Sequence, residues 1–214
     1  MERNGVGMYI DEPLQVFLDD LASEKSTPGG GSASALTGAM GAALASMVAR
    51  LTLHRQDYAT VHDEIEQVLQ QTEQLRHRFE ELMQEDIAAY GKLSAAYKLP
   101  RGTDEEKEAR SRTIQEQLVE AALVPLEVVE NAAELILYCE RIAEIGNRTV
   151  LSDVATGSML AACAGAGASW MVRVNMQAMK DEQLVEMLGE RLSRALDSIA
   201  AGNQRVTTIV GERA

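Results

Sequence analysis

Residues 65–97 read IEQVLQQTEQLRHRFEELMQEDIAAYGKLSAAY and carry the clearest periodicity of the chain. Apolar residues recur here at steps of three and four, the spacing of one face of an α-helix. This pattern predicts one long helix from about Thr60 to Tyr97. The predicted stripe consists of Ile65, Val68, Leu69, Thr72, Leu75, Phe79, Leu82, Met83, Asp86, Tyr90, Leu93 and Tyr97.

Helical segments are predicted on both sides of this stretch. Thr103 and Glu106 form a capping box at the start of the next helix, and Pro125 predicts a kink or a break further along it. Ser152 is a plausible N-cap. We therefore expect an all-α bundle of about six or seven helices, spanning about 12–24, 32–54, 60–97, 103–146 in one or two parts, 153–175 and 181–210.

The composition supports this fold class. With 214 residues, the chain suits a single domain, residues 1–214. Aromatic residues make up only 4% of it, and small residues recur at Gly38, Gly41, Ala42 and Ala45, which suits a close contact between helices. Two long tracts without charge, 26–49 and 154–172, are rich in Gly, Ala, Ser and Thr. We interpret them as interior helices and not as membrane spans.

The charge and the cysteines restrict the function. The chain has 20 Lys and Arg against 33 Asp and Glu, a formal net charge of −13, which disfavours nucleic acid and anionic membranes as partners. Cys139 and Cys163 lie in apolar helical contexts, so we expect two reduced core residues in a cytoplasmic protein. The N-terminus, with Glu2 and Arg3, has no export signal.

Asp86 is the most informative residue, because a carboxylate occupies a stripe position among apolar neighbours. Burial would raise its pKa and suit a general acid or base near neutral pH. The alternative is that Asp86 pairs with a cation or caps a group inside the bundle. Tyr90 lies one turn further along the same stripe.

The glycine run Pro28-Gly29-Gly30-Gly31-Ser32 leads directly into a helix. Its free backbone N–H groups and the positive end of the helix dipole could receive an anion such as a carboxylate. A flexible turn between two helices is the alternative. The glycines match no nucleotide-binding motif.

Further polar residues lie at the ends of predicted helices. Lys98 and Arg101 could meet an anionic ligand or could only solvate a turn. Asn147 and Arg148, followed by Ser152 and Asp153, form a polar junction that helix capping could also explain. Asn175 is an amide in an apolar tract and needs hydrogen-bond partners. The three histidines show neither a metal-ligand nor a catalytic-triad spacing.

These segments together resemble the cyclodeaminase/cyclohydrolase family, from about residue 12 to 181. The family comprises the cyclodeaminase domain of formiminotransferase-cyclodeaminase and the methenyltetrahydrofolate cyclohydrolases. The ordered motifs that carry the resemblance are Pro28–Ser32, Asp86–Tyr90, Leu99–Arg101, Thr103–Glu106, Val124–Leu126, Gly146–Asn147, Ser152–Asp153 and Val174–Asn175.

The resemblance implies a homodimeric helical bundle with a tetrahydrofolate derivative as its substrate and no metal or redox cofactor. Asp86 corresponds to the catalytic aspartate. The implied substrate-binding residues are Gly29, Gly30, Gly31, Ser32, Tyr90, Lys98, Arg101, Asn147, Ser152, Asp153 and Asn175. Two positions depart from the family pattern: Arg101 stands where Lys is usual, and Met171 stands where we expect Asn.

Two reactions use one kind of site in this family. The cyclohydrolase adds water to the methenyl carbon of 5,10-methenyltetrahydrofolate and opens the ring to 10-formyltetrahydrofolate. The cyclodeaminase closes that ring from a formimino group and releases ammonia. We expect the cyclohydrolase, with the cyclodeaminase and an inactive folate-binding or scaffold protein as alternatives.

The acidic chain also needs a locally positive site for an anionic folate. The candidate cations are Lys98, Arg101, Arg148 and Arg173. The aromatic rings available to contact a pterin are those of Tyr90, Tyr97 and Trp170.

Overall fold

The computed structural model describes residues 9–213. Within them the chain forms six α-helices and three short 3-10 turns without a strand, so the prediction of an all-α bundle is confirmed. The expectation for the N-terminus falls partly on residues 1–8, which lie outside the described residues. The helices are α1 (Leu14–Leu21), α2 (Gly30–Leu53), α3 (His62–Tyr97), α4 (Asp104–Ile145), α5 (Leu151–Gln177) and α6 (Glu182–Arg213).

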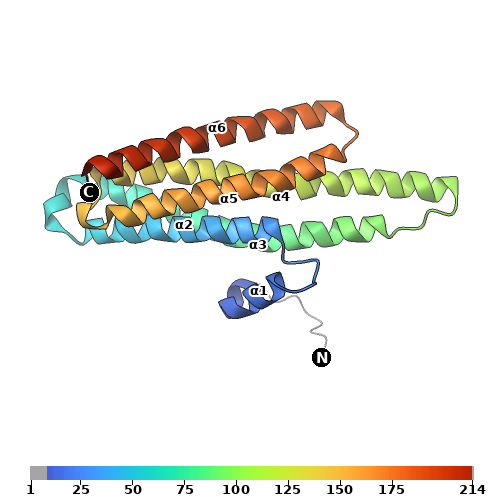
Figure 1. Ribbon diagram of the computed structural model, residues 1–214, viewed down its shortest axis with the longest axis horizontal. Coiled ribbons are helices and arrows are strands. Elements are labelled where there is room, and N and C mark those ends of the chain that lie inside the picture. Colours follow the sequence, from blue (N-terminus) through green and yellow to red (C-terminus); the bar gives the residue numbers. More distant parts are fainter. Residues whose placement is uncertain (1–8, 214) are drawn as a thin grey trace.

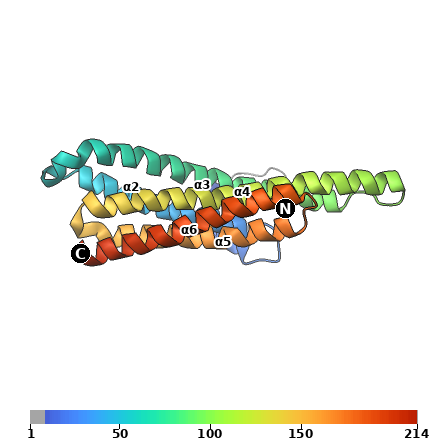
Figure 2. The ribbon, with the colours of Figure 1, turned by 90° about the horizontal axis from the view of Figure 1, so that it is seen from above.

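Helices α2, α3, α4 and α5 form an antiparallel bundle in which each packs against the next and α5 packs back against α2 (Figure 1). The long helix α6 lies on α4 and α5. Figure 2 shows that α3 and α4 continue as a pair beyond the start of α2. Helix α1 lies beside the bundle, and its Phe17 is buried.

The stripe of α3 forms a large part of the core, as its periodicity predicts. Ile65, Phe79 and Leu82 are fully buried against the neighbouring helices. Where α3 and α4 extend beyond α2, a second and smaller apolar cluster forms around Leu93 and Leu118. The start of α2 therefore lies at the junction of two apolar clusters.

Helices α2 and α5 approach each other through glycine. A Cβ atom on Gly41 would lie 2.8 Å from the carbonyl oxygen of Gly157, and a Cβ on Gly157 would lie 3.0 Å from that of Gly41. Gly38 faces the ring of Phe79 at a similarly short distance. The small residues of α2 are thus used inside one subunit.

The expectations of a helix break at Pro125 and of an N-cap at Ser152 are wrong. Helix α4 continues without a break through Pro125, and the carbonyl group that proline deprives of a donor receives one from α5. Ser152 is not an N-cap, since a 3-10 turn over Arg148–Val150 precedes α5 and the side chain of Asn147 caps that turn. The capping box of Thr103 and Glu106 is present.

The tracts without charge fall on α2 and α5. Both helices are long and apolar enough to cross a membrane by length and composition, and 50% and 39% of their most apolar windows are buried inside the bundle. Both cysteines are free. Cys139 is buried as expected, but Cys163 is exposed on the outer side of α5, so its assignment to the core is wrong.

Candidate active site

A pocket of about 430 Å³ opens where α2 begins, between the two apolar clusters. This volume suits a small-molecule ligand. Four helices and the loop before α2 form its walls. The lining residues are Ser26, Thr27, Gly29, Gly30, Gly31, Asp86, Ala89, Tyr90, Leu93, Tyr97, Leu118, Ala121, Met171, Val174, Asn175 and Ala178.

Asp86 is the only carboxylate among these lining residues. The hydroxyl group of the buried Ser32 donates a hydrogen bond of 2.7 Å to its Oδ2 atom. Desolvation raises the pKa of Asp86, while the hydroxyl and the backbone N–H of Ser32 act in the opposite direction, and desolvation is the larger effect. Among residues 9–213 no cation pairs with Asp86. The geometry suits a group that exchanges a proton with a ligand.

The glycine run provides the close approach between α2 and Asp86. Helix α2 begins at Gly30, so Gly30, Gly31 and Ser32 form its first turn, where backbone N–H groups lack helical partners. A Cβ atom on Gly31 would lie 2.0 Å from Oδ1 of Asp86, so any side chain at this position would displace the carboxyl group. The carboxylate therefore lies at the positive end of the α2 dipole, which favours its charged form.

Asn175 lines the opposite wall of the pocket. Its Nδ2 atom donates to the carbonyl oxygen of Ala121 on α4, at 2.7 Å, and to that of Met171 on its own helix, at 2.9 Å. The hydrogen bonds expected for this amide are present. Met171 lines the pocket beside Gly30. An apolar thioether therefore lies at the position where the family resemblance predicts an asparagine.

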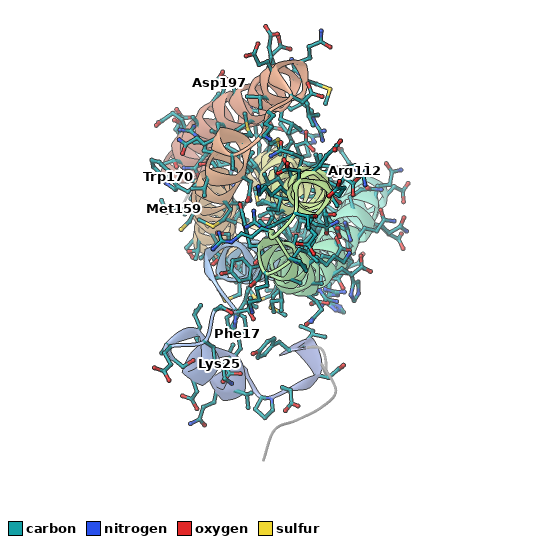
Figure 3. All side chains as sticks on the ribbon, turned by 90° about the vertical axis from the view of Figure 1, so that its right-hand side faces the viewer. Phe17, Lys25, Arg112, Met159, Trp170 and Asp197 are labelled. Atoms are coloured by element: carbon teal, nitrogen blue, oxygen red, sulfur yellow. The ribbon has the colours of Figure 1, made fainter. Side chains whose placement is uncertain are left out.

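Of the aromatic and basic candidates, some line the pocket and others do not. Tyr90 and Tyr97 line the pocket, whereas Trp170 is 62% exposed on the outer face of α5 and lies beneath the guanidinium group of Arg173. Figure 3 shows Trp170 pointing away from the bundle. Lys98 and Arg101 are exposed and follow Tyr97 at the end of α3, but they do not line the pocket.

The polar junction of Asn147, Arg148, Ser152 and Asp153 lies away from the pocket. The backbone N–H of Asn147 donates to Thr52 near the end of α2, at 3.0 Å. Thr52 lies about 30 Å along that helix from Ser32, at a rise of ~1.5 Å per residue. Asn147, Ser152 and Asp153 are therefore not brought to the pocket within one subunit, and neither is Arg148 of the same turn.

Several pocket residues were not singled out by the sequence. Leu118 and Ala121 are apolar positions within α4, and Ala178 directly follows α5. Their periodicity predicts burial, but it does not distinguish the wall of a pocket from the core. Within the described part of the chain, no three His, Cys, Asp or Glu residues gather as a group that could hold a metal ion.

Comparisons with known proteins show the family of this chain. The profile of the formiminotransferase-cyclodeaminase family matches residues 13–194. The chain belongs to this family. The resemblance recognised in the sequence is thereby confirmed, and the glycine run and Asp86 both lie within the matched region.

Individual relatives within the formiminotransferase-cyclodeaminase family carry two names. A methenyltetrahydrofolate cyclohydrolase of Methylorubrum extorquens is 39% identical over 93% of this chain and 96% of its own length. The formimidoyltransferase-cyclodeaminase of Rattus norvegicus is 30% identical over 87% of this chain and 35% of its own length. The crystal structure of a formiminotetrahydrofolate cyclodeaminase from Thermotoga maritima superposes with a TM-score of 0.86, at 30% identity, over 95% of this chain and 98% of that one.

Proposed function

We propose that this protein is a methenyltetrahydrofolate cyclohydrolase, which hydrolyses 5,10-methenyltetrahydrofolate to 10-formyltetrahydrofolate. The observation that carries the proposal is Asp86, a desolvated carboxyl group without a cation partner among the described residues, on the wall of a mainly apolar pocket. The relative of that name matches along nearly its whole length, which also supports the assignment.

In the proposed reaction, Asp86 accepts a proton from a water molecule while the oxygen of this water bonds to the methenyl carbon. The carbon then becomes tetrahedral between the two nitrogen atoms. When the bond from this carbon to N5 breaks, the hydroxyl proton passes to N5 and the carbonyl group of the formyl product forms. The first proton leaves to solvent, so the reaction consumes one water and releases one proton. Ser32 holds the carboxyl group in place for these transfers.

A formiminotetrahydrofolate cyclodeaminase is the second candidate. The structural similarity to the enzyme of that name from Thermotoga maritima favours it. In this reaction N10 attacks the carbon of the protonated formimino group, a tetrahedral carbon with an amino group forms, and ammonia leaves. Asp86 would accept the N10 proton and return a proton to the leaving nitrogen.

Incubating the purified protein with each substrate tests both candidates. The methenyl absorbance reports the first reaction, and the release of ammonia reports the second. Loss of methenyl absorbance above the uncatalysed rate, without activity on the formimino compound, supports the cyclohydrolase. Release of ammonia supports the cyclodeaminase, and binding of folate without turnover indicates an inactive folate-binding or scaffold protein.

The proposal assigns the proton transfers to Asp86 and to nitrogen atoms of the substrate, and it uses neither a metal nor a redox cofactor. We place the protein in the cytoplasm, with a small-molecule substrate and without a nucleic-acid or membrane partner. The net charge of −13 supports the exclusion of nucleic acid.

We also propose that the protein is a homodimer that associates through the outer face of α2 and α5. Within residues 33–49 of α2 and 154–172 of α5 this face has no charged residue. Its exposed side chains include Met40, Met47, Met159, Cys163 and Trp170. Met159 and Trp170 point outward together in Figure 3. In a chain with a net charge of −13, an uncharged face lets two copies approach with less repulsion than a charged face would.

A further inference from the structure

Pro125 leaves one backbone carbonyl group of α4 without its helical donor. In an α-helix the N–H of each residue donates to the carbonyl oxygen four positions earlier, so residue 125 would normally serve Ala121. Proline has no N–H. Pro125 and Ala121 are both buried, and a buried carbonyl group without a partner costs free energy.

The side chain of Asn175 supplies the missing donor from α5. Its Nδ2 atom lies 2.7 Å from the oxygen of Ala121 and 2.9 Å from the oxygen of Met171. These two bonds use both hydrogen atoms of the amide. The reversed orientation would place the amide oxygen against two carbonyl oxygens, so its partners determine which way the amide faces.

This arrangement leaves Oδ1 as the available polar atom of the side chain. No group among the described residues donates to Oδ1, and the oxygen is not among the buried side-chain atoms that lack a partner. Because Asn175 lines the pocket, the open oxygen is available to a ligand there. An amide oxygen that cannot rotate accepts from an N–H group and discriminates against a ligand acceptor at the same place.

We propose that Asn175 accepts a hydrogen bond from the amino-pyrimidine end of the folate, and that Pro125 is a positioning residue that acts through Asn175. This inference rests on the proposed function. Asp86 lies on one side of the glycine run and would face the reacting carbon. Asn175 lies one helical turn beyond Met171, whose side chain ends 3.5 Å from the position of a Cβ atom on Gly30. The amino-pyrimidine end is rich in N–H donors and lies away from the reacting carbon.

The substitution Pro125→Ala tests the positioning role without touching the ligand. Alanine restores the backbone N–H, which can donate to Ala121 and release the amide of Asn175. We expect the melting temperature to stay equal or rise, because proline is unfavourable in a helix interior. We expect KM for the folate substrate to rise about tenfold with kcat within roughly threefold, as the loss of one hydrogen bond would give.

Matched variants separate this effect from general damage. Asn175→Ala should raise KM by a similar factor, and the double variant should be no worse than Asn175→Ala alone, since both changes act on one oxygen. Pro13→Ala, at the start of α1, and Gln177→Ala, an exposed neighbour on α5, serve as controls that should leave KM unchanged.

A pair of ligands tests the donor. Binding of a 5,8-dideazafolate with a 2-amino group is compared with binding of its 2-methyl analogue, which lacks that donor. The wild type should prefer the amino compound by about tenfold, and Asn175→Ala and Pro125→Ala should both reduce this preference to roughly threefold or less. Equal preference in the wild type and both variants overturns the inference.

The outcomes also separate this inference from the proposed function. A wild-type protein that turns over neither folate substrate overturns the proposed function. A wild-type protein that is active while Pro125→Ala leaves KM unchanged overturns the positioning role alone. A fall in both the melting temperature and kcat with unchanged KM also overturns it, because that pattern indicates structural damage.

Discussion

At the scale of single residues, Asp86 lies between two opposing influences. The apolar pocket disfavours its charged form, while Ser32 and the start of α2 favour it. Desolvation is the larger effect, so the pKa lies above the ordinary value of an aspartate. A carboxyl group in this balance can take up and release a proton during one catalytic cycle.

Asp86→Asn should abolish activity while it preserves the shape of the side chain. We expect kcat to fall by at least ~10²-fold, the usual contribution of a general acid or base. Steady-state kinetics on both folate substrates measures this fall. Asp197→Asn on α6 is the matched control, and full activity of Asp86→Asn would contradict the catalytic role.

The same substitution should also stabilise the fold at neutral pH. Because the folded-state pKa is raised, the ionised carboxyl group destabilises the native state above that pKa. This penalty is absent below the pKa of the unfolded chain. The melting temperature of Asp86→Asn should therefore exceed that of the wild type at pH 7, and the difference should disappear as the pH falls below the ordinary aspartate range.

Gly31 is a position where any side chain would meet Asp86. Gly31→Ala places a Cβ atom 2.0 Å from Oδ1, so the carboxyl group must move. We expect kcat/KM to fall by about 10²-fold, because small displacements of a catalytic group are costly. Kinetics measures the loss, and Gly211→Ala, where a Cβ meets nothing within 4 Å, is the control. Activity equal to that of the control would contradict the close approach.

At the scale of elements, one stripe of α3 has two roles. Before Asp86 it is buried in the main core, as Phe79 and Leu82 show. After Asp86 it becomes a pocket wall, and Tyr90 and Tyr97 are 45% and 47% exposed. The change occurs because α2 begins beside Asp86, so the later turns of α3 have no α2 to cover them (Figure 2).

The contact of α2 with α5 should tolerate no Cβ atom. Gly41→Ala would bring its Cβ to 2.8 Å from the backbone oxygen of Gly157, which cannot move without shifting α5. We expect a loss of about 1–3 kcal/mol in the free energy of unfolding. Chemical denaturation measures it.

Gly91→Ala on α3 is the control for this contact, because nothing lies within 4 Å of its added Cβ. We expect it to stabilise the protein by about 0.4–1 kcal/mol, since alanine restricts the unfolded chain more than glycine does. If both variants were equally stable, the helices would not approach as closely as described.

At the scale of the whole molecule, charge is distributed unevenly. Acidic residues predominate over the chain, yet the outer face of α2 and α5 has none along most of its length. The end of α3 adds two exposed cations, Lys98 and Arg101, that lack ion-pair partners among the described residues. The first feature suits association between copies, and the second suits an anionic ligand.

Trp170→Glu should convert the dimer to a monomer, because it places a charge on each side of the proposed interface. Sedimentation or light scattering at micromolar concentration measures the mass. Leu137→Glu, on the exposed side of α4, is the control and should remain dimeric. A monomeric wild type, or a dimeric Trp170→Glu, would exclude this interface.

Arg101→Glu should weaken the binding of polyglutamylated folate more than the binding of the monoglutamate. Reversing one exposed charge costs about 1 kcal/mol per contact with the tail, or roughly a fivefold to tenfold loss of affinity. Binding titrations with both ligands measure it, and Arg194→Glu on α6 is the control. Equal losses for the two ligands would place Arg101 outside the binding of the tail.

The sequence by itself determined the helical class, the long stripe of α3, the capping box at Thr103 and the exceptional place of Asp86. These features depend on the spacing of residues along one helix, which the recurrence of apolar residues every three or four positions shows directly in the sequence. Only the tertiary structure decided which polar groups meet. Ser32 reaches Asp86 and Asn175 reaches Ala121 across helix contacts, whereas Asn147, Ser152 and Asp153 lie at the far end of α2. Periodicity gives the face of a helix but neither its partner nor its axial offset, which depend on how the helices pack.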